Sequence, residues 1–329
     1  TLYSAGYAKP FIVDTRDLDK KDEEKNTTFA LIRGVCRKLK NMGYTIGGFN
    51  AAVTSRVLGG SGLSSSAAFE VLLVCILDGL YNDSIIDGVT RAKISQWVEN
   101  EYFGKPSGLM DQSACSIGGL VGIDFKNADP KIEAYSFDFE ARGSNVVVLA
   151  TNSSHDDLTD EYASIPAEMK AVAAALGGKV LRQFKVQQLI EKLPEVREKT
   201  SDRAVMRALH YYDENERVKA CYQAIEEGNL DAFLQNIILS GESSWKMLQN
   251  LYVGGKCEQS LALACALSER MLKGSGAWRV HGGGFAGTIL AFVPHYKLDA
   301  YVQQMDAVFG KGACTVLGIR PVGAKKVEL

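Results

Sequence analysis

A serine- and glycine-rich stretch at residues 59–66 is the first feature of this sequence that could bind a reactive ligand. It places three glycines and four serines in eight positions, and a long apolar run follows directly. Glycine permits backbone conformations that other residues disfavour and lets a ligand approach the main chain. The serines stand where a helix would begin, and the free N–H groups at a helix N-terminus attract anions such as phosphate. The predicted phosphate-binding residues are Gly59, Gly60, Ser61, Gly62, Leu63, Ser64, Ser65 and Ser66.

This composition is also typical of a flexible linker, but a linker would not run straight into a buried helix. Phosphoryl transfer from such a loop needs a divalent cation and a group that orients or deprotonates the accepting hydroxyl. Magnesium prefers oxygen ligands, so Ser65 or Ser66 could offer a hydroxyl to it. The acidic candidates nearby in sequence are Glu99, Glu101 and Asp111. Sequence spacing alone does not choose between them, because most helical glutamates are simply exposed charges.

Asp111 stands apart because small and apolar residues surround it, from Gly108 to Cys115. A carboxylate in this context is either the N-cap of a helix or a partly buried functional group. Burial near a cation could hold it ready to accept a hydroxyl proton. The residues by themselves leave both interpretations open.

A second glycine cluster, at residues 282–287, follows His281. It indicates either another close approach of backbone to ligand or a tight turn before an edge strand. His281 is better interpreted as a structural neighbour than as a base. None of the four histidines has a metal-ligand spacing to another.

The elements that must position these residues alternate between helix and strand without strict βαβ regularity. A helix from residue 27 or 28 to about 42 precedes a strand at 47–57, which leads into the phosphate loop. The helix at 65–80 is apolar nearly all round and is expected to be buried. Further expected helices lie at about 90–102, through much of 166–250, at 258–272 and at 297–309. Further expected strands lie at 120–124, 132–137, 145–150 and 288–293. The pattern predicts an α+β protein with domains at residues 1–140 and 141–329.

Composition narrows the function further. The 329 residues include 46% hydrophobic ones, enough for two domains of roughly 100–200 residues each. A net charge of −2 does not indicate a nucleic-acid partner, and no apolar run reaches the ~18 residues of a membrane span. No signal-peptide pattern is visible, and the seven cysteines form no CxxC pair. We therefore expect buried free thiols and a cytoplasmic protein; the sequence does not indicate the oligomeric state.

Three motifs in order give the sequence a clear resemblance. Residues 60–68 resemble the second motif of the GHMP small-molecule kinases, which include galactokinase, homoserine kinase, mevalonate kinase and phosphomevalonate kinase. Residues 281–287 resemble their third motif. Gly108-Leu109-Met110-Asp111-Gln112 resembles the galactokinase version of the catalytic-aspartate loop. The similarity runs over nearly the whole chain and also includes residues 30–34 and 151–153.

The resemblance implies a two-domain GHMP-kinase fold with mixed sheets and an active site in the cleft between domains. It implies ATP-dependent phosphorylation of the anomeric hydroxyl of galactose, giving galactose 1-phosphate and ADP. By resemblance, residues 59–66 wrap the ATP phosphates, and Ser65 or Ser66 binds Mg²⁺ together with Glu99. Asp111 is the base or orienting carboxylate, and Gly108 and Tyr162 contact the substrate with it. The Gly282, Gly283 and Gly284 turn shapes the floor of the site rather than binding metal.

The sequence departs from the family in two places. The usual arginine-rich continuation after Tyr162 is replaced by residues 163–166, Ala-Ser-Ile-Pro. The N-terminal galactokinase motif, an arginine with a Gly-Glu-His-Thr-Asp run that binds the sugar hydroxyls, does not occur in these residues. Thr1 is not a start methionine and the chain opens in an alternating segment, so we expect residues missing upstream, on which activity would depend. The alternatives are a kinase for galacturonate or N-acetylgalactosamine, or a non-catalytic regulator that binds sugar and ATP.

Overall fold

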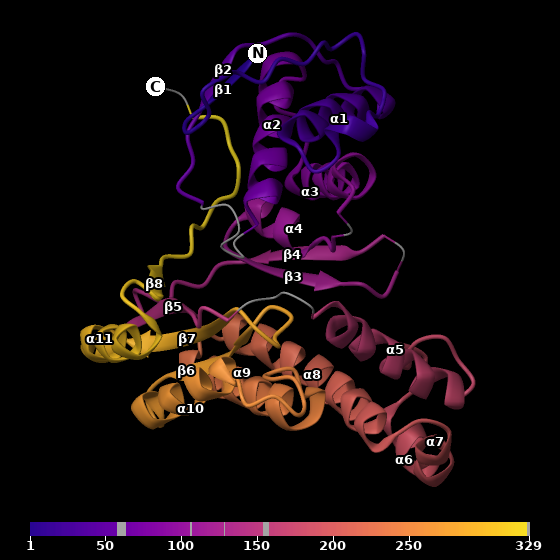
Figure 1. Cartoon of the computed structure of the whole chain (residues 1–329), viewed down its shortest axis with the longest axis vertical. Helices are drawn as coiled ribbons and strands as arrows, with labels where there is room; N and C mark the ends of the chain where they lie inside the picture. The colour runs from indigo at the N-terminus through magenta and orange to yellow at the C-terminus, as the bar shows by residue number, and fades with distance from the viewer. Residues whose placement is uncertain (58–63, 106, 128, 154–157, 328–329) are drawn as a thin grey trace. The chain divides into compact units, whose positions relative to one another are not determined.

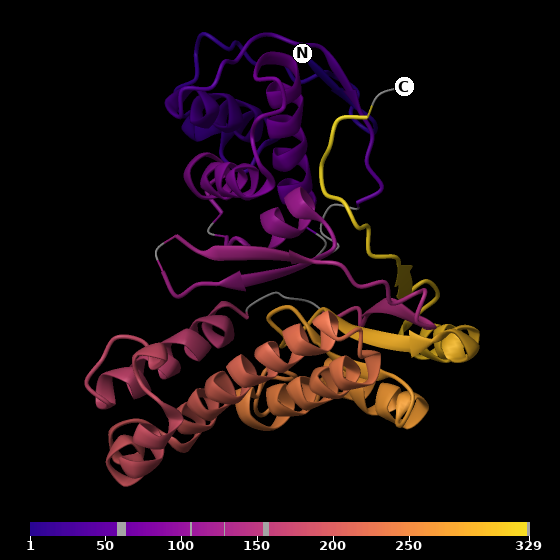
Figure 2. The same ribbon diagram turned by 180° about the vertical axis from the view of Figure 1, so that it is seen from behind.

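The computed structural model describes residues 1–57, 64–105, 107–127, 129–153 and 158–327, which form two compact units (Figure 1 and Figure 2). The first unit comprises Thr1–Ser136 and Arg320–Leu329, and the second comprises Phe137–Ile319. Helices and small β-sheets make up both units, so the α+β fold class is confirmed. The chain enters the second unit four residues before position 141. Its last ten residues belong to the first unit, which the predicted range 141–329 did not foresee.

Backbone hydrogen bonds hold this C-terminal tail on the first unit. Gly323 N–H donates to the Ile117 carbonyl at 2.9 Å, and Ala324 N–H donates to the Cys115 carbonyl at 3.1 Å. The buried Arg91 guanidinium donates to the Ala324 carbonyl at 2.7 Å. These hydrogen bonds pair polar groups that would otherwise be buried without a partner, and they hold the tail in this position.

Helices α1 (Thr28–Asn41), α2 (Ser65–Tyr81) and α3 (Gly88–Val98) of the first unit contribute to one hydrophobic cluster, and α4 (Met110–Ile117) packs against α2 and α3. A π-helical turn, η2 (Glu99–Phe103), continues α3, and a short 3-10 turn, η1 (Asp22–Glu24), precedes α1. The predicted helices at 27–42 and 65–80 are confirmed. Burial of α2 on all sides is not, because α1, α3 and α4 cover only part of it and Leu80 stays 56% exposed.

The strands of the first unit form two small ribbons. The parallel pair β1 (Leu2–Ser4) and β2 (Ala51–Val53) aligns Leu2 with Ala51. The antiparallel pair β3 (Leu120–Asp124) and β4 (Lys131–Tyr135) aligns Leu120 with Tyr135 (Figure 1). The predicted strand at 47–57 is therefore shorter than expected, since only residues 51–53 pair.

A four-stranded antiparallel sheet forms the centre of the second unit. Its order is β6-β7-β5-β8, and its strands are β5 (Ser144–Ala150), β6 (Ala277–His281), β7 (Thr288–Pro294) and β8 (Cys314–Leu317). The strands β5 and β7 read as nearly continuous apolar runs because they are interior strands with buried side chains. Two helices, α10 (Ser260–Leu272) and α11 (Leu298–Phe309), contribute to the same hydrophobic cluster.

The remaining helices of the second unit form a helical layer. They are α5 (Thr159–Ala175), α6 (Val186–Glu191), α7 (Leu193–Lys199), α8 (Asp202–Glu226) and α9 (Leu230–Ser243); the short turns are η3 (Leu181–Gln183), η4 (Ser244–Leu248) and η5 (His295–Lys297). The helix α8 carries a mixed-charge sequence, yet its Arg207 is only 1% exposed. Arg207 is buried because Glu168, Ser164 and the Leu248 carbonyl accept its hydrogen bonds or pair with its charge. Along the described ranges, none of the helices combines the length and apolarity needed to cross a membrane.

Candidate active site

The predicted phosphate loop lies only partly within the described residues. Gly59, Gly60, Ser61, Gly62 and Leu63 fall outside them. Ser64 precedes α2 in a left-handed conformation, with φ 54° and ψ 56°, and Ser65 begins the helix. The serines therefore stand at a helix N-terminus, as predicted, where unpaired N–H groups favour an anion.

Two of these serines reach carboxylates from elsewhere in the first unit. Ser64 Oγ donates a hydrogen bond to Asp111 Oδ2. Ser66 Oγ donates to Glu99 Oε1 at 2.8 Å. The start of α2, the end of α3 and the first turn of α4 thus meet at one place, with a hydroxyl paired to each acidic group.

Glu99 is buried, at 2% exposed, at the first residue of the π-helical turn. Besides Ser66, its carboxylate accepts from Gln112 Nε2 at 2.5 Å and lies 3.4 Å from Lys105 Nζ. The structure thus distinguishes Glu99 from the exposed helical glutamates with which the sequence grouped it. A carboxylate held by three donors has a fixed orientation, which a metal ligand or a structural anchor both require.

The hydrogen-bonded oxygens of Ser66 and Glu99 are spaced like two neighbouring ligands of a small hard cation. Neighbouring ligands of an octahedral Mg²⁺ with bonds of about 2.1 Å lie about 3 Å apart, close to the 2.8 Å between these two atoms. Among the residues that the structure describes, no group of three or more His, Cys, Asp or Glu side chains could hold a metal ion. A cation here would therefore take its other ligands from water and phosphate oxygens, as Mg²⁺ commonly does.

Asp111 is the second residue of α4 and is exposed. Leu109 occupies the N-cap position, so the N-cap interpretation of Asp111 is wrong, and so is the expectation of partial burial. Its carboxylate lies in the first turn, where the helix dipole favours negative charge. An ideal Cβ at Gly108 would touch nothing within 4 Å, so the loop before Asp111 leaves open space. A base that must reach a substrate hydroxyl needs such access.

The second glycine cluster forms the turn between β6 and β7 in the second unit. Gly284 has φ +84°, and a Cβ there would lie 2.1 Å from the Asn250 carbonyl oxygen. That same oxygen accepts from Phe285 N–H at 2.5 Å, and Asn250 Nδ2 donates to the Gly283 carbonyl at 3.0 Å. The turn therefore needs glycine for a close backbone approach to Asn250. It does not precede an edge strand, because β7 lies inside the sheet.

Tyr162, in the first turn of α5, is fastened to this turn. Its hydroxyl donates to the Gly284 carbonyl at 2.8 Å. Its ring packs edge-on against the Phe285 ring, with the two ring centroids 5.4 Å apart. Burial raises the pKa of the Tyr162 hydroxyl. The structure thus brings Tyr162 and residues 282–284 together within the second unit. Contact of either with a substrate stays a prediction.

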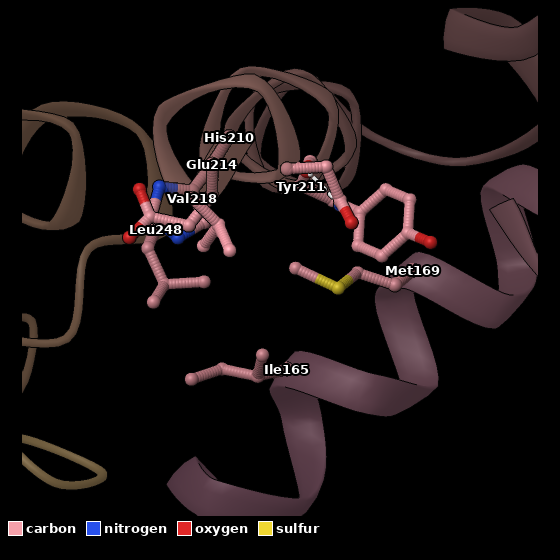
Figure 3. Close-up of a pocket in the computed structure, with 8 residues that line it drawn as sticks. Ile165, Met169, His210, Tyr211, Glu214, Val218 and Leu248 are labelled. Atoms are coloured by element: carbon pink, nitrogen blue, oxygen red, sulfur yellow. Dashed lines mark hydrogen bonds between the residues drawn. The ribbon is translucent and has the colours of Figure 1, made fainter. Parts of the chain in front are cut away.

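A pocket of about 260 Å³ lies between α5 and α8 in the second unit, and Ile165, which lines it, also packs with Tyr162 against Phe285. Figure 3 shows Ile165 and Met169 on one side of it and Val218 and Leu248 on the other. Its histidine, His210, is bonded to Ser243 at 2.8 Å, and burial lowers the pKa of the imidazole. The surface of the pocket is mostly apolar, and none of the predicted site residues lines it.

Sequence reasoning missed two side chains next to Glu99. Gln112 follows Asp111 and is completely buried, and Glu70 is completely buried one turn after Ser66. A signal was present for Glu70: it is a lone carboxylate inside the apolar run of residues 67–77. Burial and the neighbouring Glu99 charge raise the pKa of Glu70 to about 9.

The chain is similar in sequence to known proteins. Residues 30–119 match the family model described as the GHMP kinases N terminal domain. The chain is 30% identical to a galactokinase of Streptomyces coelicolor over 312 residues, covering 94% of this chain and 77% of that protein. It is 27% identical to a galactokinase of Clostridium tetani, covering 92% and 74%.

Solved structures show the same fold. A galactokinase of Lactococcus lactis complexed with galactose superposes with a TM-score of 0.76 at 22% identity, covering 99% of this chain and 83% of that one. A mevalonate kinase of L. major in complex with R-mevalonate gives a TM-score of 0.59 at 15% identity, covering 98% and 83%.

Proposed function

This chain belongs to the galactokinases of the GHMP kinase family, and on that premise we propose that it phosphorylates galactose. The reaction transfers the γ-phosphoryl group of ATP to the anomeric hydroxyl, giving galactose 1-phosphate and ADP. The observation that carries the proposal is the meeting of Ser64 and Ser66 with Asp111 and Glu99 at the N-terminus of α2. Phosphoryl transfer needs these parts: an anion site, a cation site and a carboxylate for the acceptor.

Asp111 acts on the accepting hydroxyl. Its exposed carboxylate accepts a hydrogen bond from Ser64 Oγ, which fixes one oxygen toward the start of α2. The other oxygen is left to orient the sugar hydroxyl and to accept its proton as the O–P bond forms. The free N–H groups at the N-terminus of α2 favour the negative charge on the phosphates that remain on ADP.

Ser66 and Glu99 hold Mg²⁺ in this proposal, with Ser65 as the neighbouring hydroxyl. When bound, the cation neutralises charge on the phosphates during transfer. Gln112 and Lys105 keep the Glu99 carboxylate oriented toward Ser66. Tyr162 and the Gly282–Gly284 turn are proposed as substrate-side parts of the site, with Tyr162 contacting the sugar and the turn shaping the floor. Gly108 is proposed to leave room for the sugar beside Asp111.

The test is sugar-dependent ADP release by the purified protein with ATP and magnesium. We expect turnover with galactose and a product whose phosphate is attached at the anomeric carbon, identified by ³¹P and ¹H NMR. Galacturonate and N-acetylgalactosamine belong in the same assay, because turnover with one of them and not with galactose would identify a related sugar kinase. Binding of galactose and ATP by calorimetry without turnover of any of these sugars would refute the proposal and indicate a regulator.

A further inference from the structure

A buried arginine of the second unit has no part in the reaction as proposed so far. Arg207 lies on α8, beside α5 (Figure 1), and its side chain is only 1% exposed. Residues 163–166 lack the arginines that are usual after Tyr162 in the family, yet the structure brings Arg207 to this segment from α8. Burying a guanidinium is costly unless hydrogen bonds and an opposite charge compensate, so its partners show what it connects.

One guanidinium nitrogen of Arg207 contacts the start of α5. Its Nη1 donates to Ser164 Oγ at 2.9 Å and lies 3.0 Å from Glu168 Oε2. Ser164 Oγ in turn donates to the Glu161 carbonyl at 2.7 Å. Because Glu161 directly precedes Tyr162, Arg207 is connected to the helical turn that carries the proposed sugar contact.

Another nitrogen of the same guanidinium contacts the segment that supports the turn between β6 and β7. Arg207 Nε donates to the Leu248 carbonyl at 3.1 Å. Two residues later comes Asn250, which is only 3% exposed. Its Nδ2 donates to the Gly283 carbonyl at 3.0 Å, and its own carbonyl accepts from Phe285 N–H at 2.5 Å. Arg207 therefore lies behind the turn as well as behind α5.

Tyr162 closes these contacts into a continuous network. Its hydroxyl donates to the Gly284 carbonyl at 2.8 Å, and a Cβ at Gly283 would lie 2.7 Å from its aromatic ring. The network runs from Arg207 through α5 to the turn between β6 and β7, and returns through Asn250. Side chains in a satisfied buried network hold one another in place, so the position of each depends on the others.

We propose that Arg207 positions Tyr162 and the turn between β6 and β7 for the sugar, by joining α5 to the segment before Asn250. Arg207 acts through these residues and is therefore a positioning residue. A planar guanidinium donates from separate nitrogens in fixed directions, whereas the ammonium group of lysine is a single point. The inference rests on the proposed function, because Tyr162 contacts the sugar only in that proposal.

The experiment compares Arg207→Lys with Met305→Ala. Lysine keeps a positive charge beside Glu168 but cannot reproduce the two directions in which Arg207 donates. The matched control, Met305→Ala, truncates a fully buried side chain of the same unit on α11, a helix outside the network. Small displacements of positioning groups cost up to about 10²-fold. We expect Arg207→Lys to raise the KM for galactose about tenfold or more, with the KM for ATP within about twofold.

Hydrogen exchange of the Phe285 amide, followed by NMR, gives a second readout that needs no sugar. This N–H is bonded to the Asn250 carbonyl, so its exchange measures local opening of the turn. We expect exchange to be about tenfold faster in Arg207→Lys. Met305→Ala should lower the melting temperature but leave this exchange and the KM for galactose within about twofold.

A double-mutant cycle tests whether Arg207 acts through Tyr162. Tyr162→Phe removes the hydroxyl that donates to Gly284 and so opens the network at another point. In this background, Arg207→Lys should raise the KM for galactose by only about threefold or less, since residues of one network are not additive. Full additivity would show that the two residues act independently, and the inference would be wrong.

The other outcomes also decide the question. If Arg207→Lys leaves either the KM for galactose or Phe285 exchange unchanged, the inference is wrong. If Met305→Ala changes both as strongly, lost stability explains the effect and the inference fails. Should Arg207→Lys not fold, Ser164→Ala takes its place, because it removes the hydroxyl between Arg207 and Glu161, and the same directions are expected. If galactose is not phosphorylated, the proposed function fails, while Phe285 exchange still decides whether Arg207 holds the turn.

Discussion

The proposed chemistry depends on one exposed carboxylate, Asp111, and on the serine hydroxyl that holds it. Ser64 fixes one oxygen of Asp111, and Ser66 does the same for Glu99 on the neighbouring element. A base and a cation ligand held from one helix N-terminus keep a constant separation, which phosphoryl transfer needs because it depends mainly on positioning.

Replacing Asp111 by asparagine tests this assignment. Asparagine keeps an acceptor for Ser64 but cannot take a proton, so we expect kcat to fall by about 10²–10⁴-fold. Affinity for ADP with magnesium, measured by calorimetry, should change less than twofold. The matched control is Asp87→Ala, which removes the hydrogen bonds to Thr90 at the start of α3 and should reduce stability but not kcat. A near-normal kcat in Asp111→Asn would remove Asp111 from the reaction.

At the scale of elements, sequence patterns located most helices and strands but did not show which of their faces are buried. The start of α2 at Ser65 could be predicted, because serines precede a long apolar run. The exposed face of α2 could not be predicted. The helices that cover α2 come from residues distant in sequence, and their packing decides which face stays exposed. The burial of Glu99 also escaped prediction, since its partners Ser66 and Gln112 come from two other elements.

The turn between β6 and β7 gives a prediction at this scale. In Gly284→Ala a methyl group would meet the Asn250 carbonyl at 2.1 Å, in a backbone conformation with φ +84°. We expect a loss of about 1–3 kcal/mol from crowding in addition to about 1–2 kcal/mol for the left-handed conformation. Gly282→Ala is the control, because its φ is +73° but nothing lies within 4 Å of its Cβ. Equal losses of unfolding free energy in chemical denaturation would show that the contact with Asn250 is unimportant.

At the scale of the whole molecule, each unit has its own hydrophobic core, and the chain passes between the units twice. Helices α1–α3 contribute to the main cluster of the first unit, and the four-stranded sheet with α10 and α11 forms the main cluster of the second. A division near residue 140 was expected from the change of pattern along the chain. The return of residues 320–329 to the first unit was not, because Gly323 and Ala324 bond to residues about 200 positions away and no local pattern specifies such a partner.

The tail contact leads to the last prediction, Gly323→Ala. A Cβ at this position would lie 2.0 Å from the Ser116 carbonyl oxygen, a backbone atom of α4 that cannot move without disturbing the helix. We expect the first unit to lose about 1–3 kcal/mol and hydrogen exchange at residues 110–119 to become faster, while the sheet of the second unit keeps its protection. Gly318→Ala is the matched control, since its Cβ meets nothing within 4 Å. Because α4 also carries Asp111, Gly323→Ala should lower kcat as well; unchanged exchange in α4 would show that the tail does not support the element that holds the base.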